Sequence, residues 1–326
     1  MVAQDGFSAH VLCDGRFCLD EPIGQGTAAY VWRATDLATL EKVAVKIFSS
    51  PLGAAPQEHQ ALWEAAALRS VSNPHVVRII SDGLIEHPHT GARTPYLALE
   101  LVPGTNLHRY IAERGAQPAA DVARRALGLV DGLSALHSAG FIHGDIKPSN
   151  ILLDAATGNA KITDLGTAVC RDRSPAQASS YGSLPYMSPE QVRGLPLGTA
   201  TDVYSLGLVL LECLTGVRPF DLPAVESLVV RTVRSPEAPP TLTRQWVSLL
   251  MAMTAMEAQE RPTAEQCRQL LARLAGSTGD PEAPAAAAAP HAAPHAGAHT
   301  GPHRLAATPA SRPCARASTG LQRSAR

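Results

Sequence analysis

The segment from His143 to Asn150 reads His-Gly-Asp-Ile-Lys-Pro-Ser-Asn and brings a carboxylate, a cation and an amide close together. Phosphoryl transfer needs a carboxylate to accept a hydroxyl proton, a cation on the phosphate in transfer and an oxygen ligand for Mg²⁺. Asp145, Lys147 and Asn150 could supply these three functions. A second carboxylate follows in the turn Thr163-Asp164-Leu165-Gly166. The two segments together indicate phosphoryl transfer more specifically than either one alone.

A glycine-rich turn lies nearer the N-terminus, between two segments that are typical of strands. Residues 23–31 read Ile-Gly-Gln-Gly-Thr-Ala-Ala-Tyr-Val, and their glycines let the backbone approach phosphates and point N–H groups at them. The strand Val43-Ala44-Val45-Lys46 follows, in which Ala44 and Lys46 face the same way. Lysine is rare in this chain, so Lys46 is a candidate phosphate ligand. A simple hairpin turn beside a solvated surface lysine gives the same pattern.

The elements that must position these residues change character midway along the chain. Short strands are expected over 17–19, 31–35, 42–48, 75–80 and 96–101, and a helix over 57–70. From Asp121 the apolar residues follow helical spacing up to a stop at Gly140. Further helices are expected over 203–215, 246–256 and 264–274. The sequence therefore predicts an α+β fold, with a small sheet-rich lobe followed by a larger helical lobe.

Length and composition limit the class of protein. The chain has 326 residues, with 28 Lys and Arg against 29 Asp and Glu, so its charge gives no reason to expect nucleic acid as a partner. Six scattered cysteines without metal-ligand spacing favour a reducing compartment. The N-terminus lacks the pattern of a signal peptide, and the apolar stretch from Val203 to Val217 is too short for a membrane span. These features predict a cytoplasmic protein.

Both ends of the chain differ from the region between them. Residues 1–16 form a short N-terminal extension, and residues 276–326 are rich in Ala, Pro, His and Arg. The second segment is predicted to be a disordered tail, because it has little apolar surface to bury. Within it His291, His295, His299 and His303 recur every four residues, a spacing that could bind a metal on a helix. Nearby prolines and glycines oppose a helix, so compositional bias is the preferred interpretation.

The chain from about Phe17 to Leu274 resembles the protein kinase family, and within it the bacterial, eukaryotic-like (Hanks-type) Ser/Thr kinases. The glycine-rich loop, the Val-Ala-Val-Lys strand, the 143–150 loop and the Asp-x-Gly element occur in the family's order. They are followed by Ser188-Pro189-Glu190 in the Ala-Pro-Glu position, Asp202–Gly207 and Arg261-Pro262. The resemblance implies the two-lobed protein kinase fold over residues 17–275, with ATP and Mg²⁺, or Mn²⁺ in its place, between the lobes.

The resemblance also implies an ATP site. Lys46 would hold the α- and β-phosphates and pair with Glu64 on the first helix, with Glu58 as the runner-up. The backbone from Glu100 to Val102 would read the adenine, with Leu99 behind it. The complete set implied for ATP is Ile23, Gly24, Gly26, Val31, Ala44, Lys46, Glu64, Glu100 and Val102.

The same resemblance implies the roles of the remaining residues. Asp145 would be the catalytic base and Lys147 the cation on the γ-phosphate. Asn150 and Asp164 would be the Mg²⁺ ligands. The structural residues would be Glu190 and Arg261, as a buried ion pair, and Asp202, which would orient the 143–150 loop.

By resemblance the chain would be a serine/threonine protein kinase in cytoplasmic signalling, acting on proteins whose identity the sequence does not give. Self-association with autophosphorylation is expected, and nucleic acid is not expected as a partner. Many bacterial relatives carry a membrane helix and a sensor after the kinase domain, whereas this sequence ends in a short polar segment. The expectation is a kinase without its own sensor.

The sequence departs from the family pattern at several positions. Ala29 replaces the third glycine of the loop, and Leu165 replaces the Phe of the Asp-Phe-Gly element. Gly144 stands where most family members carry an Arg that pairs with a phosphate on the activation loop. Activity is therefore expected to depend little on phosphorylation of that loop, whose candidate acceptors are Ser174, Ser179, Ser180 and Tyr181. Ser183 keeps the hydroxyl expected near Lys147, and Cys170 is interpreted as an inert loop residue rather than a redox site.

Two alternatives stay open. Small-molecule phosphotransferases of the aminoglycoside-kinase type share a His-Gly-Asp loop, but they usually lack the Lys that follows and the later motifs. Lys147, Glu190 and Asp202–Gly207 therefore favour protein as the substrate, and the Asp-Ile-Lys-Pro-x-Asn setting favours Ser or Thr over Tyr. A pseudokinase that only binds partners would usually lack Lys46, Asp145 or Asp164, all of which are present.

Overall fold

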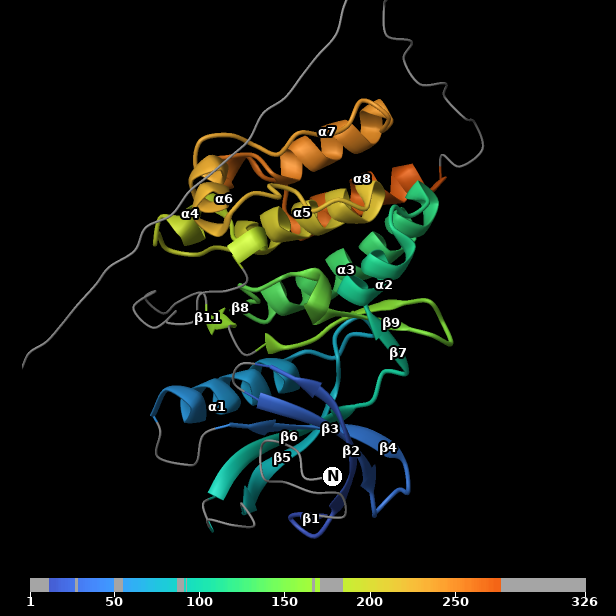
Figure 1. Cartoon of the computed structure of the whole chain (residues 1–326), viewed down its shortest axis with the longest axis vertical. Helices are drawn as coiled ribbons and strands as arrows, with labels where there is room; N and C mark the ends of the chain where they lie inside the picture. Colours follow the sequence, from blue (N-terminus) through green and yellow to red (C-terminus); the bar gives the residue numbers. More distant parts are fainter. Residues whose placement is uncertain are drawn as a thin grey trace, which may run out of the picture. The chain divides into compact units, whose positions relative to one another are not determined.

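The structure is a computed structural model that describes residues 12–26, 29–49, 55–86, 91, 93–165, 168–170 and 184–276. All of these residues belong to the compact unit that spans residues 1–284. Within it a sheet-rich N-terminal part precedes a mainly helical C-terminal part, and Figure 1 shows the blue strands and the green-to-orange helices as two separate groups. This order of elements confirms the predicted α+β architecture.

A six-stranded antiparallel sheet forms the N-terminal part, in the order β1-β2-β3-β4-β6-β5. Its strands are β1 (Leu12–Cys13), β2 (Phe17–Gln25), β3 (Ala29–Asp36), β4 (Lys42–Phe48), β5 (Ile79–Glu86) and β6 (Arg93–Glu100). Side chains alternate between its faces. Ala44 and Phe48 join the larger hydrophobic core, whereas Val43, Val45 and Ile47 pack in a smaller cluster on the opposite face.

The register of this sheet aligns three residues of the candidate ATP site. Gly24 on β2 is paired with Val31 on β3, and Val31 is paired with Lys46 on β4. Directly opposed residues of antiparallel strands share a face. The glycine-rich turn, Val31 and Lys46 are therefore placed in one row on the face that carries the larger core.

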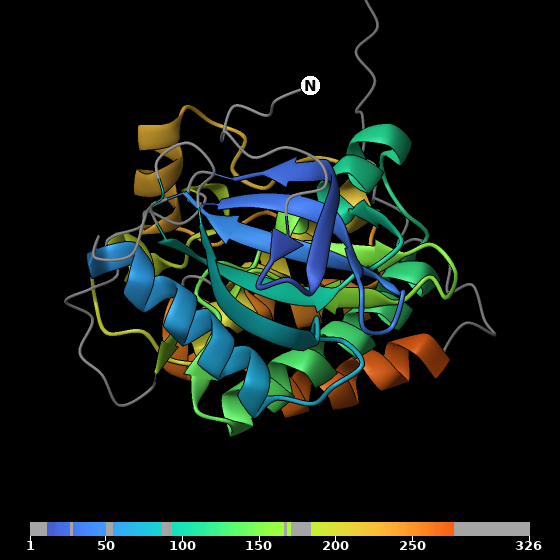
Figure 2. The ribbon, with the colours of Figure 1, turned by 90° about the horizontal axis from the view of Figure 1, so that it is seen from below.

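Helix α1 (Ala55–Ser70) packs against that same face, as Figures 1 and 2 show from two directions. Its residues Ala61, Ala65 and Leu68 are buried in the larger core. Small alanines let the helix approach the sheet closely. This approach brings Glu64, on the same buried side, next to the strand that carries Lys46.

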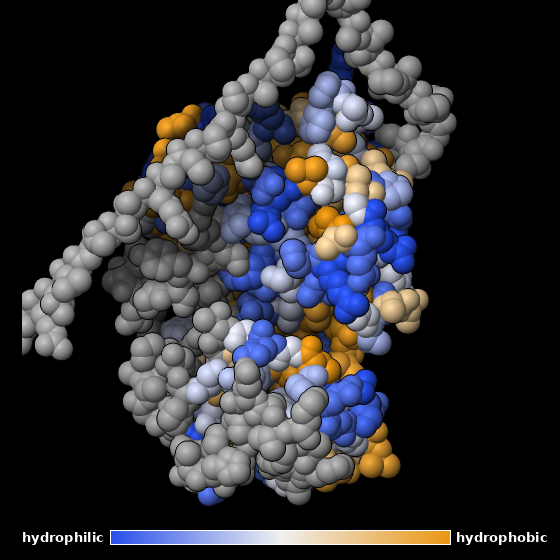
Figure 3. Space-filling model, in the orientation of Figure 1, coloured by the Kyte–Doolittle hydropathy of each residue, from blue (hydrophilic) through white to orange (hydrophobic). Residues whose placement is uncertain are grey.

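Helices dominate the C-terminal part, as the spacing of apolar residues predicts. They are α2 (Leu107–Arg114), α3 (Ala119–Ser138), α4 (Pro189–Val192), α5 (Ala200–Thr215), α6 (Ala224–Arg231), α7 (Arg244–Met253) and α8 (Ala264–Gly276). Gly140, at φ 84°, follows the end of α3 as expected. The face drawn in Figure 3 has blue hydrophilic residues between separate orange patches, as expected when the apolar sides of helices pack inward. None of the described helices is long and apolar enough to cross a membrane.

Short strands between these helices hold the chemical segments in place. A three-stranded sheet contains β7 (Gly104–Asn106), β9 (Ile151–Asp154) and β10 (Ala160–Ile162), and β8 (Phe141–Ile142) pairs with β11 (Val169–Cys170). The 143–150 loop runs from β8 to β9, with a short 3₁₀ turn at Pro148–Asn150. Both of its ends are thus fixed by strand pairing.

The predicted strand over 75–80 is wrong in its position. The strand begins at Ile79, and the preceding residues form an isolated parallel bridge between Val76 and Ile162 of β10. The Val77 N–H donates to the Ile162 carbonyl, and the Ile162 N–H donates to the His75 carbonyl. The apolar residues of this run are buried against the helical part rather than in the six-stranded sheet. A short apolar run has the same pattern in both environments, so the sequence does not separate them.

Gly128 in α3 gives a first testable prediction, because a Cβ added there would lie 2.4 Å from the His75 ring. That ring is held by a hydrogen bond between its Nδ1 and the Ala160 carbonyl. Alanine stabilises a helix by about 1 kcal/mol relative to glycine, whereas overpacking costs about 1–3 kcal/mol. Because the His75 ring is held in place, we expect the overpacking cost at the upper end of this range, so that Gly128→Ala lowers the free energy of unfolding by about 1–2 kcal/mol, measured by urea denaturation.

Gly198 supplies the control for this substitution, because an added Cβ there would meet no atom within 4 Å. Gly198→Ala is expected to leave the free energy of unfolding within about 0.5 kcal/mol of the wild type. A Gly128→Ala variant as stable as the wild type would contradict the close packing of α3 against His75.

Candidate active site

Lys46 lies at the centre of a cluster of charges in which Lys46 and Glu64 are buried and the Asp164 side chain is about half exposed. Its Nζ is 2.7 Å from Glu64 Oε1, 2.6 Å from Glu64 Oε2 and 2.6 Å from Asp164 Oδ1. The three residues come from β4, from α1 and from the turn after β10. Asp164 has φ 65°, a conformation that residues other than glycine adopt infrequently. The structure therefore brings together three candidate residues that lie far apart in the sequence.

Burial and mutual attraction set the charges of this cluster. Burial disfavours the ammonium of Lys46, but Glu64 and Asp164 outweigh that effect and raise its pKa above the ordinary value. Burial raises the pKa of Glu64 to about 6, although Lys46 acts against this shift. Lys46 also holds the pKa of Asp164 below its usual range. The cluster thus keeps the Lys46 ammonium charged in a largely buried position beside the glycine-rich turn.

The 143–150 loop gathers a second group of candidates around Asp145. Lys147 Nζ lies 2.6 Å from Asp145 Oδ2, and Asn150 Nδ2 donates to the same oxygen at 3.2 Å. Asn150 Nδ2 also donates to the Asp145 backbone carbonyl at 3.0 Å. Two donors therefore fix the orientation of the Asp145 carboxylate.

Asp202 anchors the start of this loop from inside the helical part. Its carboxylate accepts hydrogen bonds from the backbone N–H groups of His143 and Gly144, at 2.9 and 2.8 Å, and contacts His137 Nε2 at 2.8 Å. Burial alone raises the pKa of Asp202, but His137 and these donors bring it below its usual range. A fully buried carboxylate with three partners makes a rigid support for the loop.

Backbone contacts join the two groups of candidates. The Thr163 N–H donates to the Asn150 carbonyl at 3.0 Å, and His143 Nε2 donates to the Thr163 carbonyl at 3.1 Å. His143 Nδ1 in turn accepts from the Asp145 N–H, so the ring carries a proton on Nε2. Thr163 precedes Asp164, and Asp164 is therefore tied to the loop that holds Asp145.

The remaining candidates for the ATP site lie on one side of the sheet and in the segment that follows β6. Ala44 and Leu99 are buried in the larger core, and Val31 and Val102 pack against it while partly exposed. Ile23 is 47% exposed at the end of β2. Gly24 lies in β2, the Gly26 N–H donates to the Ala29 carbonyl, and Glu100 ends β6.

Asn150 and Asp164 each carry a side-chain oxygen of the kind that Mg²⁺ prefers as a ligand. The Asn150 nitrogen is turned toward Asp145, which leaves its amide oxygen directed away from that contact. Mg²⁺ prefers oxygen ligands and is commonly held by one or two protein groups together with phosphate oxygens and water. In the part of the chain that the structure describes, no group of three His, Cys, Asp or Glu forms a complete metal cage. Asn150 and Asp164 therefore fit a metal ion whose other ligands are phosphate oxygens and water.

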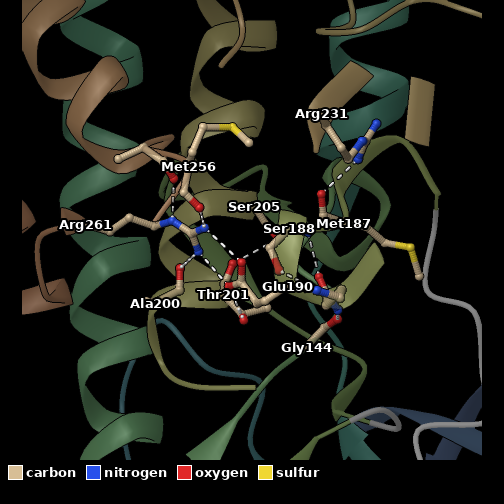
Figure 4. A network of polar contacts seen from close by, with 12 residues as sticks. Gly144, Met187, Ser188, Glu190, Ala200, Thr201, Ser205, Arg231, Met256 and Arg261 are labelled. Atoms are coloured by element: carbon tan, nitrogen blue, oxygen red, sulfur yellow. Dashed lines mark hydrogen bonds and ion pairs between the residues drawn. The ribbon is translucent and has the colours of Figure 1, made fainter. Parts of the chain in front are cut away.

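Glu190 and Arg261 form a bidentate ion pair, at 2.6 and 2.8 Å, deep in the helical part (Figure 4). Thr201 donates to the same carboxylate, and the guanidinium also reaches the carbonyls of Ala200 and Met256. Burial alone raises the pKa of Glu190, but Arg261 and Thr201 bring it below its ordinary value. The pair ties the start of α4 to the segment before α8.

Removal of Arg261 leaves the buried Glu190 carboxylate without its cation, so Arg261→Met is expected to lower the free energy of unfolding by about 3–5 kcal/mol. The pKa of Glu190 is lowered on folding, so the stabilisation is complete above its ordinary value of 4.5 and is lost as the pH falls through the folded value. The difference in the free energy of unfolding between wild type and Arg261→Met should therefore become smaller below pH 4.5. Denaturant unfolding at several pH values measures this.

Arg268 provides a matched control, because it pairs with Glu265 on the surface, where both side chains are about half exposed. Arg268→Met is expected to change stability little. An equal effect of the two arginine substitutions would contradict the structural role assigned to the buried pair.

Two contacts at this site involve residues that sequence reasoning left without a role. Lys161 on β10 pairs with Glu100 Oε1 at 2.6 Å, and Gln191 Nε2 donates to the Gly144 carbonyl at 2.7 Å. The rarity of lysine in the chain was a signal for Lys161. The Ser-x-x-Gln spacing of Ser188 and Gln191 was a signal for a helix cap, though not for the second contact.

Several predictions concern residues outside the described part of the chain. These are Gly166, Ser174, Ser179, Ser180, Tyr181, Ser183 and the tail from 277 to 326 with its four histidines. For Glu58 and Cys170 the structure gives the backbone element alone, α1 and β11.

The Leu165 side chain is fully buried in the larger core, as expected of an apolar replacement for Phe.

Comparison with known proteins gives a consistent result. Among curated proteins the chain is 34% identical over 264 residues to a probable serine/threonine-protein kinase PknB of Bifidobacterium longum, an alignment covering 77% of this chain and 38% of that protein. It is 32% identical to serine/threonine-protein kinase PknA of Mycobacterium tuberculosis, over 70% of this chain and 53% of that protein. Serine/threonine-protein kinase PkaA of Streptomyces coelicolor is 30% identical, over 81% and 51%.

The chain spans about one third to one half of the length of these relatives. Residues 17–270 match the family profile described as the protein kinase domain. The sheet-rich and helical parts correspond to the two lobes of that fold. With this match over most of its length, the chain belongs to the protein kinase family.

Proposed function

We propose that this chain is a serine/threonine protein kinase, which transfers the γ-phosphate of ATP to Ser or Thr hydroxyls of proteins. The observation that carries the proposal is the contact of Lys46 Nζ with both Glu64 and Asp164 at 2.6–2.7 Å. In protein kinases the strand lysine pairs with the helix glutamate when phosphates can be bound. The names of the relatives support the same activity.

In this proposal Asp145 accepts the proton of the attacking hydroxyl. The hydroxyl oxygen forms a bond to the γ-phosphorus, and the bond from that phosphorus to the bridging oxygen of ADP breaks. Lys147, 2.6 Å from the Asp145 carboxylate, contributes positive charge where the transferred phosphoryl group carries negative charge. The orientation of Asp145 by Lys147 and Asn150 supports this division of roles.

Asn150 and Asp164 are the proposed ligands of Mg²⁺, with Mn²⁺ as the second candidate. The metal, when bound, neutralises charge on the phosphates. Lys46 is proposed to hold the α- and β-phosphates, and Glu64 to hold Lys46. Each of these assignments uses an oxygen or nitrogen atom that the described contacts orient.

Adenine is proposed to bind the backbone between Glu100 and Val102, at the exit of β6. Ile23, Val31 and Ala44 supply apolar contacts to the ring, because they share the sheet face or its edge with Lys46. Gly24 and Gly26 allow the backbone near the phosphates. Glu190, Asp202 and Arg261 are proposed to have structural roles.

Protein substrates and self-association with autophosphorylation belong to this proposal, as does a kinase domain over residues 17–275. The proposed location is the cytoplasm, where ATP is abundant and thiols stay reduced. Cys13, Cys18, Cys213 and Cys267 are free thiols in the described part of the chain, which is compatible with such a compartment.

The test is to supply the purified protein with Mg²⁺ and ATP labelled in the γ-phosphate, together with a generic protein acceptor or an aminoglycoside. The proposal predicts label on Ser and Thr of protein, identified by phosphoamino acid analysis. Label on the aminoglycoside alone would instead support a small-molecule phosphotransferase. Binding of ATP without transfer to any acceptor would indicate a pseudokinase.

A further inference from the structure

Gly144 lies directly before Asp145, and both sides of its backbone are held by side chains. Its N–H donates to Asp202 Oδ1 at 2.8 Å, and its carbonyl accepts from Gln191 Nε2 at 2.7 Å. Its φ of 74° lies in the left-handed region that favours glycine. The peptide that leads into Asp145 is thus fixed from α5 on one side and from α4 on the other.

Both ends of the Gln191 side-chain amide are in use. Its Oε1 accepts from the Ser188 N–H at 2.9 Å, and the Ser188 hydroxyl accepts from the Gln191 N–H at 3.3 Å, which together form a capping box. Its Nε2 donates to Gly144. The Ser188 N–H requires an oxygen and the Gly144 carbonyl requires a nitrogen, so the two contacts fix the orientation of the amide.

The base from which Gln191 extends is itself anchored, as Figure 4 shows. The neighbouring Glu190 is held by Arg261, and the Met187 carbonyl accepts from Arg231 at 2.9 Å. Ser205 of α5 donates to the Tyr186 carbonyl at 2.8 Å. The start of α4 therefore has the rigidity needed to position a group in the 143–150 loop.

We propose that Gln191 is a positioning residue for Asp145, acting through the Gly144 carbonyl. This inference rests on the proposed kinase function. The family resemblance leads to an Arg at position 144 that docks on a phosphate, whereas this chain has no side chain there. The amide of Gln191 supplies a neutral contact to the same residue, independent of any phosphate. The alternative is that Gln191 serves only to cap α4.

Gln191→Glu separates these two roles. A glutamate keeps an oxygen for the Ser188 N–H, since Glu is a normal capping-box residue, but it places an acceptor against the Gly144 carbonyl. We expect kcat to fall about tenfold and the KM for ATP to stay within about twofold, while the melting temperature falls no more than it does in Ser188→Ala. Gln191→Met removes the donor to Gly144 together with the oxygen that accepts from the Ser188 N–H, so it is expected to lower kcat by a similar factor and the melting temperature as well.

Ser188→Ala is the matched control, because it removes the hydroxyl of the cap and leaves the amide contact to Gly144. It is expected to lower the melting temperature while kcat stays within about twofold of the wild type. A purely capping role of Gln191 predicts the opposite pattern, in which loss of activity follows loss of melting temperature in every variant.

Amide hydrogen exchange of residues 141–150 provides a readout that does not depend on activity. Exchange should be faster in Gln191→Glu than in the wild type and unchanged in Ser188→Ala. Wild-type protein that transfers no phosphate would refute the proposed function, while the exchange pattern would still report on the contact. Wild-type exchange and wild-type kcat in Gln191→Glu would overturn the inference.

Discussion

Asp145→Asn is expected to lower kcat by about 10²–10⁴-fold, the usual contribution of a positioned general base. The amide is nearly the same size and keeps an oxygen that can accept from Lys147, but it does not take up the hydroxyl proton at neutral pH. The KM for ATP should change little, since Asp145 is proposed to act on the acceptor. The melting temperature should also be retained. Steady-state kinetics and a thermal melt measure these quantities.

Asp154 offers a control for this substitution. It is an aspartate at the end of β9 whose carboxylate accepts from the backbone N–H groups of Ala156 and Thr157. Asp154→Asn should leave kcat unchanged. An Asp145→Asn variant that keeps kcat within tenfold of the wild type would contradict the role of Asp145 as the base.

Lys46→Met is expected to lower kcat by about 10²–10³-fold, the effect of removing one preorganised charged donor. The substitution removes the cation that lies between Glu64 and Asp164. Glu64 is fully buried, and without Lys46 its pKa should rise further above its present value of about 6. The KM for ATP should rise as well, because the phosphates lose a ligand.

The effect of Lys46→Met can be divided by a double-mutant cycle with Glu64→Gln. If Glu64 acts only through Lys46, the double variant should be no less active than Lys46→Met alone. Lys42, the exposed first residue of the same strand, provides a control, because its Nζ pairs with Asp20 at 2.9 Å, away from Glu64 and Asp164. Lys42→Met should leave kcat and KM unchanged, and a loss as large as that of Lys46→Met would contradict the assignment.

The order of the folded elements could be predicted from the sequence, because it depends on local spacing. The alternation of Val43 to Lys46 indicates a strand, and the apolar residues from Asp121 to Gly140 indicate a helix. The short elements α2, α4, α6 and β7 to β11 were not predicted, and the segment that begins at His75 was predicted in the wrong environment. Its pairing partner, Ile162, lies on β10 far along the chain, and a short apolar run does not reveal whether it joins a sheet or another buried surface.

The candidate site could be predicted where one short segment carries several groups. The contacts among Asp145, Lys147 and Asn150 follow from their closeness in sequence. Contacts across the chain are different in kind. Gln191 and Gly144 are separated by 47 residues, and the capping box explains only one end of the Gln191 amide. The second contact depends on how α4 packs against the 143–150 loop, which no local pattern encodes.

The most direct test of the proposed function is transfer of the labelled γ-phosphate of ATP by wild-type protein beside Asp145→Asn, under conditions where both variants are shown to be folded and to bind ATP. The proposal predicts phosphoserine or phosphothreonine with the wild type and a rate at least about a hundredfold lower with Asp145→Asn. Equal transfer by the two proteins, or no transfer to protein by the wild type, would contradict it.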